Sequence, residues 1–169
     1  MRVSMSALSF AAVAAAIDLP NYPPDGNVAL TVGAGSSLEG YKLAGFLSEG
    51  KGFPELVPAT EAKPDTWYLH FWNLVHTGWY AITMNIDGTT YQLERNPNDF
   101  ELTPQTEYSS GDDLWQPRLD SPVFPWWGSE TAFPFGCTRD DGHIQLSIHE
   151  ADDVPANCEQ IQLEYHLLA

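Results

Sequence analysis

Short runs in which apolar and polar residues alternate recur along the chain, and no convincing helical pattern separates them. Alternation with a period of two is typical of β-strands that are buried on one face. Proline and glycine are spread between the runs and keep them short. We therefore expect one all-β domain, a single-domain β-sandwich (jelly-roll-like, or an open barrel) of eight or nine short antiparallel strands. The pattern predicts strands over residues 27–32, 41–46, 67–72, 79–86, 89–96, 99–103, 131–135, 143–149 and 159–168.

The pair Asp87-Gly88 predicts the most specific local structure, a two-residue β-hairpin turn. Aspartate followed by glycine readily adopts the positive φ angles that such a turn requires. If Ile86 faces Thr89 across this turn, one face of the hairpin is apolar and the other is polar with a tryptophan near its end. The predicted pairs are Ile86–Thr89, Met84–Tyr91, Ile82–Leu93 and Tyr80–Arg95 on the first face, and Asn85–Thr90, Thr83–Gln92, Ala81–Glu94 and Trp79–Asn96 on the second.

The two cysteines, Cys137 and Cys158, constrain the last third of the chain. In an oxidising compartment we expect them to form a disulfide, which requires Cα atoms within about 7 Å. A simple meander of the last three strands would hold the two cysteines about 20 Å apart. We therefore predict that residues 151–158 run back across the domain. The final strand then starts near Cys137 and runs parallel to residues 143–149, in the opposite sheet.

The N-terminus has the layout of a secretory signal peptide. Arg2 is followed by an uncharged, mostly apolar run that ends in small residues at Ala16, as in a cleavage site of the A-x-A kind. We predict that residues 1–16 are removed and that residues 17–169 form the domain. No later window holds the ~18 consecutive apolar residues of a membrane span. The sequence thus predicts a secreted, extracellular protein.

Charge narrows the range of partners. The chain carries 23 acidic and 7 basic side chains, with a formal net charge of −16. Nucleic acids and anionic membranes bind basic surfaces, so we expect neither as a partner. The partner that we expect instead is an extracellular small molecule or glycan, and we expect a monomer.

Metal and cofactor motifs are absent from the sequence, and we expect no bound cofactor. The cysteines and histidines do not have zinc-site spacing. Three acidic doublets could hold calcium, but none has the residue order of a preformed calcium loop, and solvated turns are the default interpretation. The doublets are Asp112-Asp113, Asp140-Asp141 and Asp152-Asp153.

Histidines lie on the polar faces of two predicted strands. One interpretation is that both faces are solvated outer faces of the sandwich. The other is a concave cleft in which a histidine and a carboxylate share a substrate proton. For this role the weak catalytic candidates are His70, His166 and Glu164; His149 and Glu150 point to opposite faces and pair poorly. The two polar faces are His143, Gln145, Ser147 and His149, and Gln160, Gln162, Glu164 and His166.

Aromatic residues supply the candidate ligand surface. Trp126 and Trp127 lie in a stretch rich in proline and glycine. They could plug the open end of the core, stack against a ligand, or anchor a protein interface. The ring of His70 lies between two aromatics of its strand, either as part of a ligand platform or as an ordinary hydrogen-bonded histidine. The ligand-binding candidates are Trp126, Trp127, Trp72, Tyr68 and Trp79.

Two functions remain open at this point. The first is a secreted, non-catalytic binding module, with carbohydrate as one ligand class, that uses exposed aromatics in loops. The alternative is a small secreted enzyme, an isomerase, lyase or glycan hydrolase, with a histidine and carboxylate pocket. The chain has neither a G-x-S-x-G nucleophile motif nor a phosphate-binding glycine loop. A pocket that joins His70 or His166 to a carboxylate of perturbed pKa would favour the enzyme.

Overall fold

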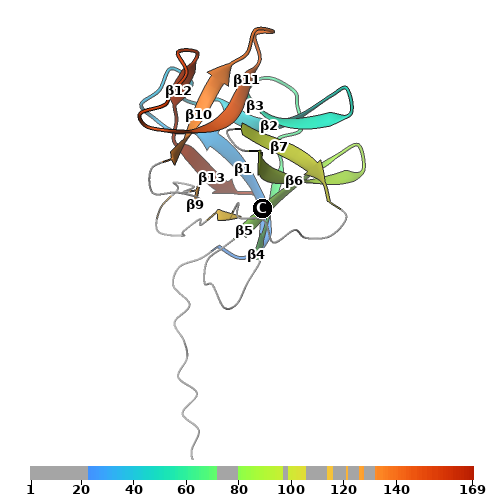
Figure 1. Cartoon of the computed structure of the whole chain (residues 1–169). Coiled ribbons are helices and arrows are strands. Elements are labelled where there is room, and N and C mark those ends of the chain that lie inside the picture. The colour runs from blue at the N-terminus through green and yellow to red at the C-terminus, as the bar shows by residue number, and fades with distance from the viewer. Residues whose placement is uncertain are drawn as a thin grey trace, which may run out of the picture.

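The computed structural model describes residues 23–71, 80–96, 99–105, 114–115, 121, 126–127 and 132–169. These residues form strands and turns and no helix, so the predicted all-β class is confirmed (Figure 1). The strands are β1 (Gly26–Val32), β2 (Lys42–Ser48), β3 (Lys51–Val57), β4 (Trp67–Phe71), β5 (Tyr80–Ile86), β6 (Thr89–Asn96), β7 (Asp99–Pro104), β8 (Leu114–Trp115), β9 (Trp126–Trp127), β10 (Ala132–Thr138), β11 (Ile144–Glu150), β12 (Cys158–Gln160) and β13 (Leu163–Leu167).

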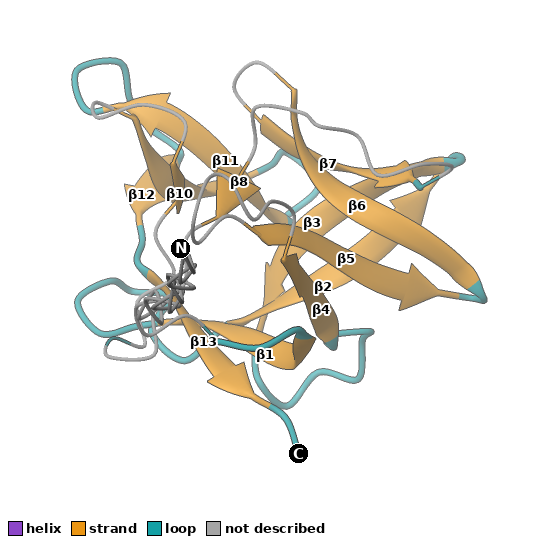
Figure 2. Ribbon diagram, turned by 90° about the horizontal axis from the view of Figure 1, so that it is seen from below, coloured by secondary structure: helices purple, strands orange, loops and turns teal. Residues whose placement is uncertain are grey.

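The strands form a closed barrel, and the predicted sandwich or open barrel is wrong in this respect (Figure 2). Among the described residues, eight strands pair antiparallel in a circuit that runs β1, β4, β5, β6, β7, β11, β3, β2 and back to β1. The remaining strands extend this barrel: β13 pairs with β1, β10 and β12 follow β11, and β8 and β9 follow β5. Closure satisfies strand edges that a sandwich would leave unpaired.

Two strands act as junctions and close the barrel. One end of β1 pairs with β4 and the other end with β2. In the same way β11 pairs with both β3 and β7, while β3 and β7 meet directly at Gly52 and Leu102. A Cβ atom on Gly52 would lie only 2.5 Å from the Cβ of Leu102, so this contact requires glycine. Such non-local contacts leave no signal in the alternation of one strand.

The barrel interior is filled by large aromatic and aliphatic side chains. Trp67, Tyr80, Phe100 and Trp115 are among the largest fully buried side chains. The indole N–H of Trp67 donates a hydrogen bond to the carbonyl oxygen of Leu43 at 2.9 Å, so this buried polar group is satisfied. Trp115 packs against Phe100, with ring centroids 5.5 Å apart. The described residues include no helix with the length and apolar character of a membrane span.

The predicted hairpin is confirmed around its turn. Asp87 and Gly88 have φ angles of 53° and 84°, as the two-residue turn requires. The ladder consists of four of the predicted pairs, from Ile86–Thr89 to Thr83–Gln92. The described ladder ends at the pair Thr83–Gln92, so it lacks the predicted pairs of Ile82 and Ala81, and Tyr80 pairs with Trp115 of β8 instead of Arg95. Trp79 and the predicted pair that contains it lie outside the described residues.

The predicted disulfide and the return of the chain before it are confirmed in outline. Cys137 is bonded to Cys158, and their Cα atoms are 4.0 Å apart. β10 pairs antiparallel with β11 and with β12, so β12 runs parallel to β11, as predicted. The prediction that this strand lies in the opposite sheet is wrong for β12, which pairs with β10. The last predicted strand breaks after residue 160, and its second part pairs with β1 as β13. Residues 1–16, the predicted signal peptide, lie outside the described residues.

Candidate functional site

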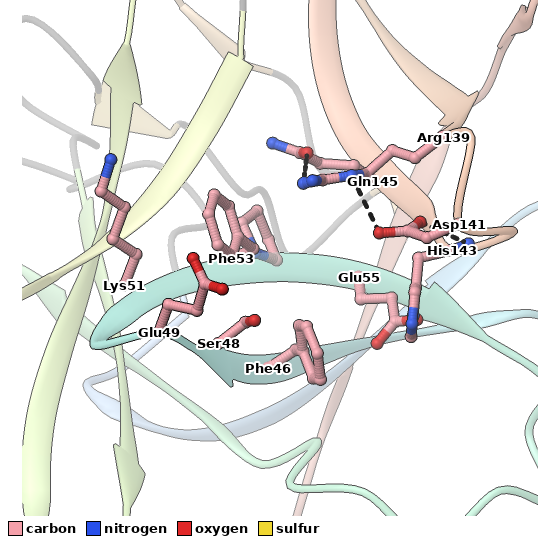
Figure 3. A pocket seen from close by; sticks show the side chains of 11 residues that line it. Phe46, Ser48, Glu49, Lys51, Phe53, Glu55, Arg139, Asp141, His143 and Gln145 are labelled. Atoms are coloured by element: carbon pink, nitrogen blue, oxygen red, sulfur yellow. Dashed lines mark hydrogen bonds and ion pairs between the residues drawn. The ribbon is translucent and has the colours of Figure 1, made fainter.

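A cavity of about 370 Å³ opens on the outer surface of the barrel, over β2, β3 and the start of β11 (Figure 3). Two tight turns shape its ends. The β2–β3 turn has positive φ angles at Glu49 and Gly50, and the β10–β11 turn has one at Gly142. The side chain of Asp141 accepts a hydrogen bond from the backbone N–H of His143 at 3.1 Å, which fixes the second turn. This bears out the turn predicted for the Asp140-Asp141 doublet.

Two phenylalanines provide the apolar part of the cavity wall. Phe46 and Phe53 are directly opposite each other in the β2–β3 ladder. Residues that face one another across a ladder point to the same side of the sheet. Both side chains are half-buried and line the cavity, as Figure 3 shows. The hairpin thus presents two neighbouring rings to the same space.

Glu55 is the buried charge of the site. The residue is only 5% exposed. Its carboxylate forms an ion pair with Lys63 Nζ at 2.5 Å and a hydrogen bond with His143 Nδ1. Lys63 also bonds Glu61 at 3.2 Å. Burial alone would lower the pKa of Lys63, but its hydrogen bonds to Glu55 and Glu61 and their negative charges raise the pKa above the ordinary lysine value. Lys63 is therefore a stable cation that compensates the buried carboxylate.

His143 is held in one orientation by two contacts. Its Nδ1 bonds the carboxylate of Glu55, and its ring stacks on Phe46 with centroids 5.0 Å apart. Its Nε2 has no hydrogen-bond partner in the described part of the chain. The side chain is 38% exposed. A carboxylate-oriented histidine beside a cavity is a typical arrangement for proton transfer.

Arg139 and Gln145 form the polar wall on the other side. The guanidinium of Arg139 lies 5.3 Å from the centre of the Phe53 ring and donates from Nη1 to Gln145 Oε1 at 2.9 Å. Gln145 in turn donates from Nε2 to the carbonyl oxygen of Phe100 at 3.3 Å. Arg139 Nε also lies 3.6 Å from Asp141. Two planar polar groups are therefore fixed in place, and Arg139 has further N–H donors for a ligand.

A second cavity of about 450 Å³ continues along β11. It shares Phe53, Arg139 and Gln145 with the first and reaches His149 and the disulfide. At its side the hydroxyl of Ser147 donates to Asp99 at 2.6 Å. The polar face predicted for residues 143–149 therefore lines a concave surface. We call the two cavities together the β11 groove.

The other predicted polar face, on β13, lies outside this groove. His166 Nε2 is 2.9 Å from the hydroxyl of Thr31 on the neighbouring strand. The carboxylate of Glu164 lies over Gly33, with an oxygen 2.5 Å from where a Cβ would be. Neither His166 nor Glu164 lines the β11 groove. Their catalytic role remains a prediction.

His70 is paired with a carboxylate, also away from the groove. Its Nδ1 lies 3.0 Å from Asp25 Oδ2. Tyr68, two residues earlier on β4, is 40% exposed. Trp72 and Trp79 lie outside the described residues.

Trp126 and Trp127 form β9, whose backbone pairs with β8. Their side chains lie outside the described residues. The ligand-binding role assigned to them therefore stays a prediction.

Most residues of the β11 groove were not predicted from the sequence. Glu55 lies on β3, a strand that was not predicted because Gly52 and Pro54 interrupt its pattern. A single acid in an apolar run, as in Glu55-Leu56-Val57, was the available signal, since a buried carboxylate requires partners. The partners themselves, Lys63 and His143, could not be inferred from spacing.

The chain matches no model of a known protein family, no curated protein and no solved structure. The residues of the groove are therefore the evidence for its function.

Proposed function

We propose that this is a secreted protein that binds a neutral, hydroxyl-rich small molecule or glycan in the β11 groove. The observation that carries the proposal is the pair of rings, Phe46 and Phe53, beside planar polar side chains that are already fixed. A sugar ring has an apolar C–H face that stacks on an aromatic ring and hydroxyls that bond planar donors and acceptors. Pockets with apolar walls and a few positioned polar groups are typical small-molecule sites.

The charges favour a neutral ligand. Glu55 is compensated by Lys63 and His143, and Arg139 lies between Gln145 and Asp141. The formal net charge of −16 repels anions over the whole surface. A free cation would meet Arg139 in the groove. A neutral ligand is repelled neither by the net negative charge nor by Arg139. Export of the protein would bring it into contact with extracellular glycans.

Calorimetric titration with a panel of neutral mono- and oligosaccharides tests the proposal. We expect saturable binding, and we expect Phe46→Ala and Arg139→Ala each to weaken it by about tenfold or more, as for central contacts of a binding site. Leu167→Ala is the control, because Leu167 is an exposed apolar residue on β13, away from the groove. Thermal unfolding of each variant separates lost contacts from lost fold. Absence of binding by the wild type, or an equal loss in Leu167→Ala, would overturn the proposal.

One observation favours the second candidate, a small secreted enzyme. The contact between Glu55 and His143 Nδ1 orients an imidazole whose Nε2 can exchange a proton with a bound ligand. Because Glu55 is held by Lys63 as well, His143 is the group to act as acid or base. This suits an isomerase or lyase better than a glycan hydrolase, which uses two carboxylates beside the bond.

Turnover assays on any saccharide that binds separate the two functions. For the enzyme, His143→Gln should reduce turnover by about 10²-fold or more while binding persists. Binding by the wild type without turnover supports the binding protein instead.

A further inference from the structure

The far end of the β11 groove brings together three residues of types that ligate metals in proteins. His149 Nε2 lies 3.6 Å from Cys137 Sγ and 3.8 Å from Cys158 Sγ. All three ligand atoms lie within 4.8 Å of one another. The cysteines are joined as a disulfide, so as they stand they cannot hold a metal. Reduction would convert the same atoms into two thiolates and an imidazole.

The distances to the histidine already fit a tetrahedral metal. With bonds of about 2.3 Å to sulfur and about 2.05 Å to nitrogen, a tetrahedral zinc site has a sulfur-to-nitrogen separation of roughly 3.6 Å. The two observed separations, 3.6 and 3.8 Å, are close to this value. The two sulfurs would need to lie about 3.8 Å apart in such a site. Cα atoms 4.0 Å apart are compatible with that separation after small side-chain rotations.

The backbone holds the three residues together without the disulfide. Cys137 is central: its strand pairs with β11, which carries His149, and with β12, which carries Cys158. Just beyond it, the N–H of Thr138 donates to the carbonyl oxygen of Asn157 at 2.9 Å, and Asn157 Nδ2 donates back to the carbonyl oxygen of Thr138 at 2.8 Å. Neither of these hydrogen bonds involves a sulfur atom. The ligand set is therefore largely preformed.

The surroundings leave room for a fourth ligand. All three residues line the 450 Å³ cavity, together with Asp99 and Asn157. The ring of His149 is held edge-on by Phe135, with centroids 5.6 Å apart. A metal bound here would reach water or a ligand in the groove, as metals with three protein ligands do.

We propose that, in the reduced protein, Cys137, Cys158 and His149 form a site for a thiophilic divalent metal such as Zn²⁺. A dithiol reductant supplies two electrons and two protons to the disulfide and closes to its own disulfide. The metal then displaces one proton from each thiol and accepts the lone pair of neutral His149 Nε2. The two thiolates balance the charge of the ion. Disulfide and metal are thus alternative occupants of one site, and this inference does not depend on the proposed ligand of the groove.

Titration with Co²⁺ tests the site, because tetrahedral cobalt bound to thiolates absorbs strongly. The protein is reduced with a water-soluble phosphine, which becomes a phosphine oxide with an oxygen from water and competes little for the metal. We expect one Co²⁺ per chain, a sulfur-to-cobalt charge-transfer band, and displacement by Zn²⁺. His149→Ala should weaken binding by about tenfold or more. His166→Ala is the matched control, since its ring lies on β13 beside Thr31, and should bind as the wild type does.

Three results would overturn the proposal. The first is a reduced, folded wild-type protein that binds no Co²⁺. The second is equal binding by His149→Ala and the wild type, which would mean that the cysteines bind alone. The third is loss of fold on reduction that Co²⁺ does not reverse, measured by far-ultraviolet circular dichroism. An oxidised sample gives the baseline and should show no charge-transfer band.

Discussion

The outer faces of β11 and β13 have the same alternating sequence pattern but lie in different surroundings. On β11, Gln145 and Ser147 point out of the barrel and are nevertheless 8% and 2% exposed. On β13, Glu164 is half-buried and His166 is exposed. Both strands bury the alternate residues in the barrel. The difference therefore lies outside the barrel, not in its core.

Neighbouring strands explain the contrast. β11 is paired with β10 along one edge and with both β3 and β7 along the other. The β2–β3 hairpin and the segment before β12 then rise beside its outer face, and side chains from them line the groove. In the described residues β13 pairs with β1 alone. Alternation thus predicts which residues point outward, whereas non-local pairing decides whether the outward surface is concave.

The largest expected effect comes from disturbing the contact that closes the barrel beside β11. Gly52→Ala places a Cβ 2.5 Å from the Cβ of Leu102 and 2.7 Å from its carbonyl oxygen. We expect it to lower the free energy of unfolding by about 2–3 kcal/mol, as over-packing does. Gly26→Ala on β1 is the matched control, because its Cβ would meet nothing closer than 4.0 Å; it should change stability by less than about 0.5 kcal/mol. Urea unfolding measures both, and equal effects would contradict this account of closure.

The same closing contact explains how much of the fold could be predicted. The Asp87-Gly88 hairpin was predictable because turn chemistry and alternation are local and agree. β3 was missed because Gly52 and Pro54 weaken a strand pattern. That glycine is needed by a partner 50 residues away, Leu102, which no local pattern reveals.

The candidate site was predictable only in part, for a similar reason. His143 and Gln145 were identified on a polar strand face, and a cleft there was one of two interpretations. The carboxylate that orients His143 belongs to Glu55, 88 residues earlier in the chain. His166 and Glu164 were predicted as the candidate pair instead, because they are two residues apart on one strand. Proximity along the chain was a poor guide to pairing across the barrel.

A carboxylate in the groove and one on β13 should respond differently to the same change. Glu55→Gln removes the negative charge that contacts both Lys63 and His143. We expect this change to lower the free energy of unfolding by about 1–2 kcal/mol at neutral pH. Glu164→Gln should change stability by less than about 0.5 kcal/mol, as typical surface substitutions do. The pKa of Lys63 should also fall in Glu55→Gln, because Glu55 helps to raise it. Urea unfolding and NMR titration of Lys63 test this pair. A Glu55→Gln variant as stable as the wild type would show that the contacts of Glu55 with Lys63 and His143 add nothing to stability.

The smallest expected effect concerns a half-buried carboxylate outside the groove that is fixed by hydrogen bonds. Glu159 on β12 accepts hydrogen bonds at 2.5 Å from the hydroxyl and from the backbone N–H of Ser37. The hydroxyl bond, and then the backbone bond, lower its pKa below the ordinary glutamate value. A carboxyl with a lowered pKa stabilises the fold at a pH above its unfolded-state pKa, and this contribution is lost as the pH falls through its folded-state pKa.

Ser37→Ala removes the hydroxyl bond and keeps the backbone bond. We expect the pKa of Glu159, followed by NMR of its side-chain carboxyl carbon, to rise toward the ordinary value without fully reaching it. The small stability difference between the variant and the wild type should vanish at low pH, where Glu159 is protonated in both. Asp153→Asn is a matched surface control and should leave the titration of Glu159 unchanged. An unchanged pKa in Ser37→Ala would mean that solvent screens the hydrogen bond between the Ser37 hydroxyl and the Glu159 carboxylate.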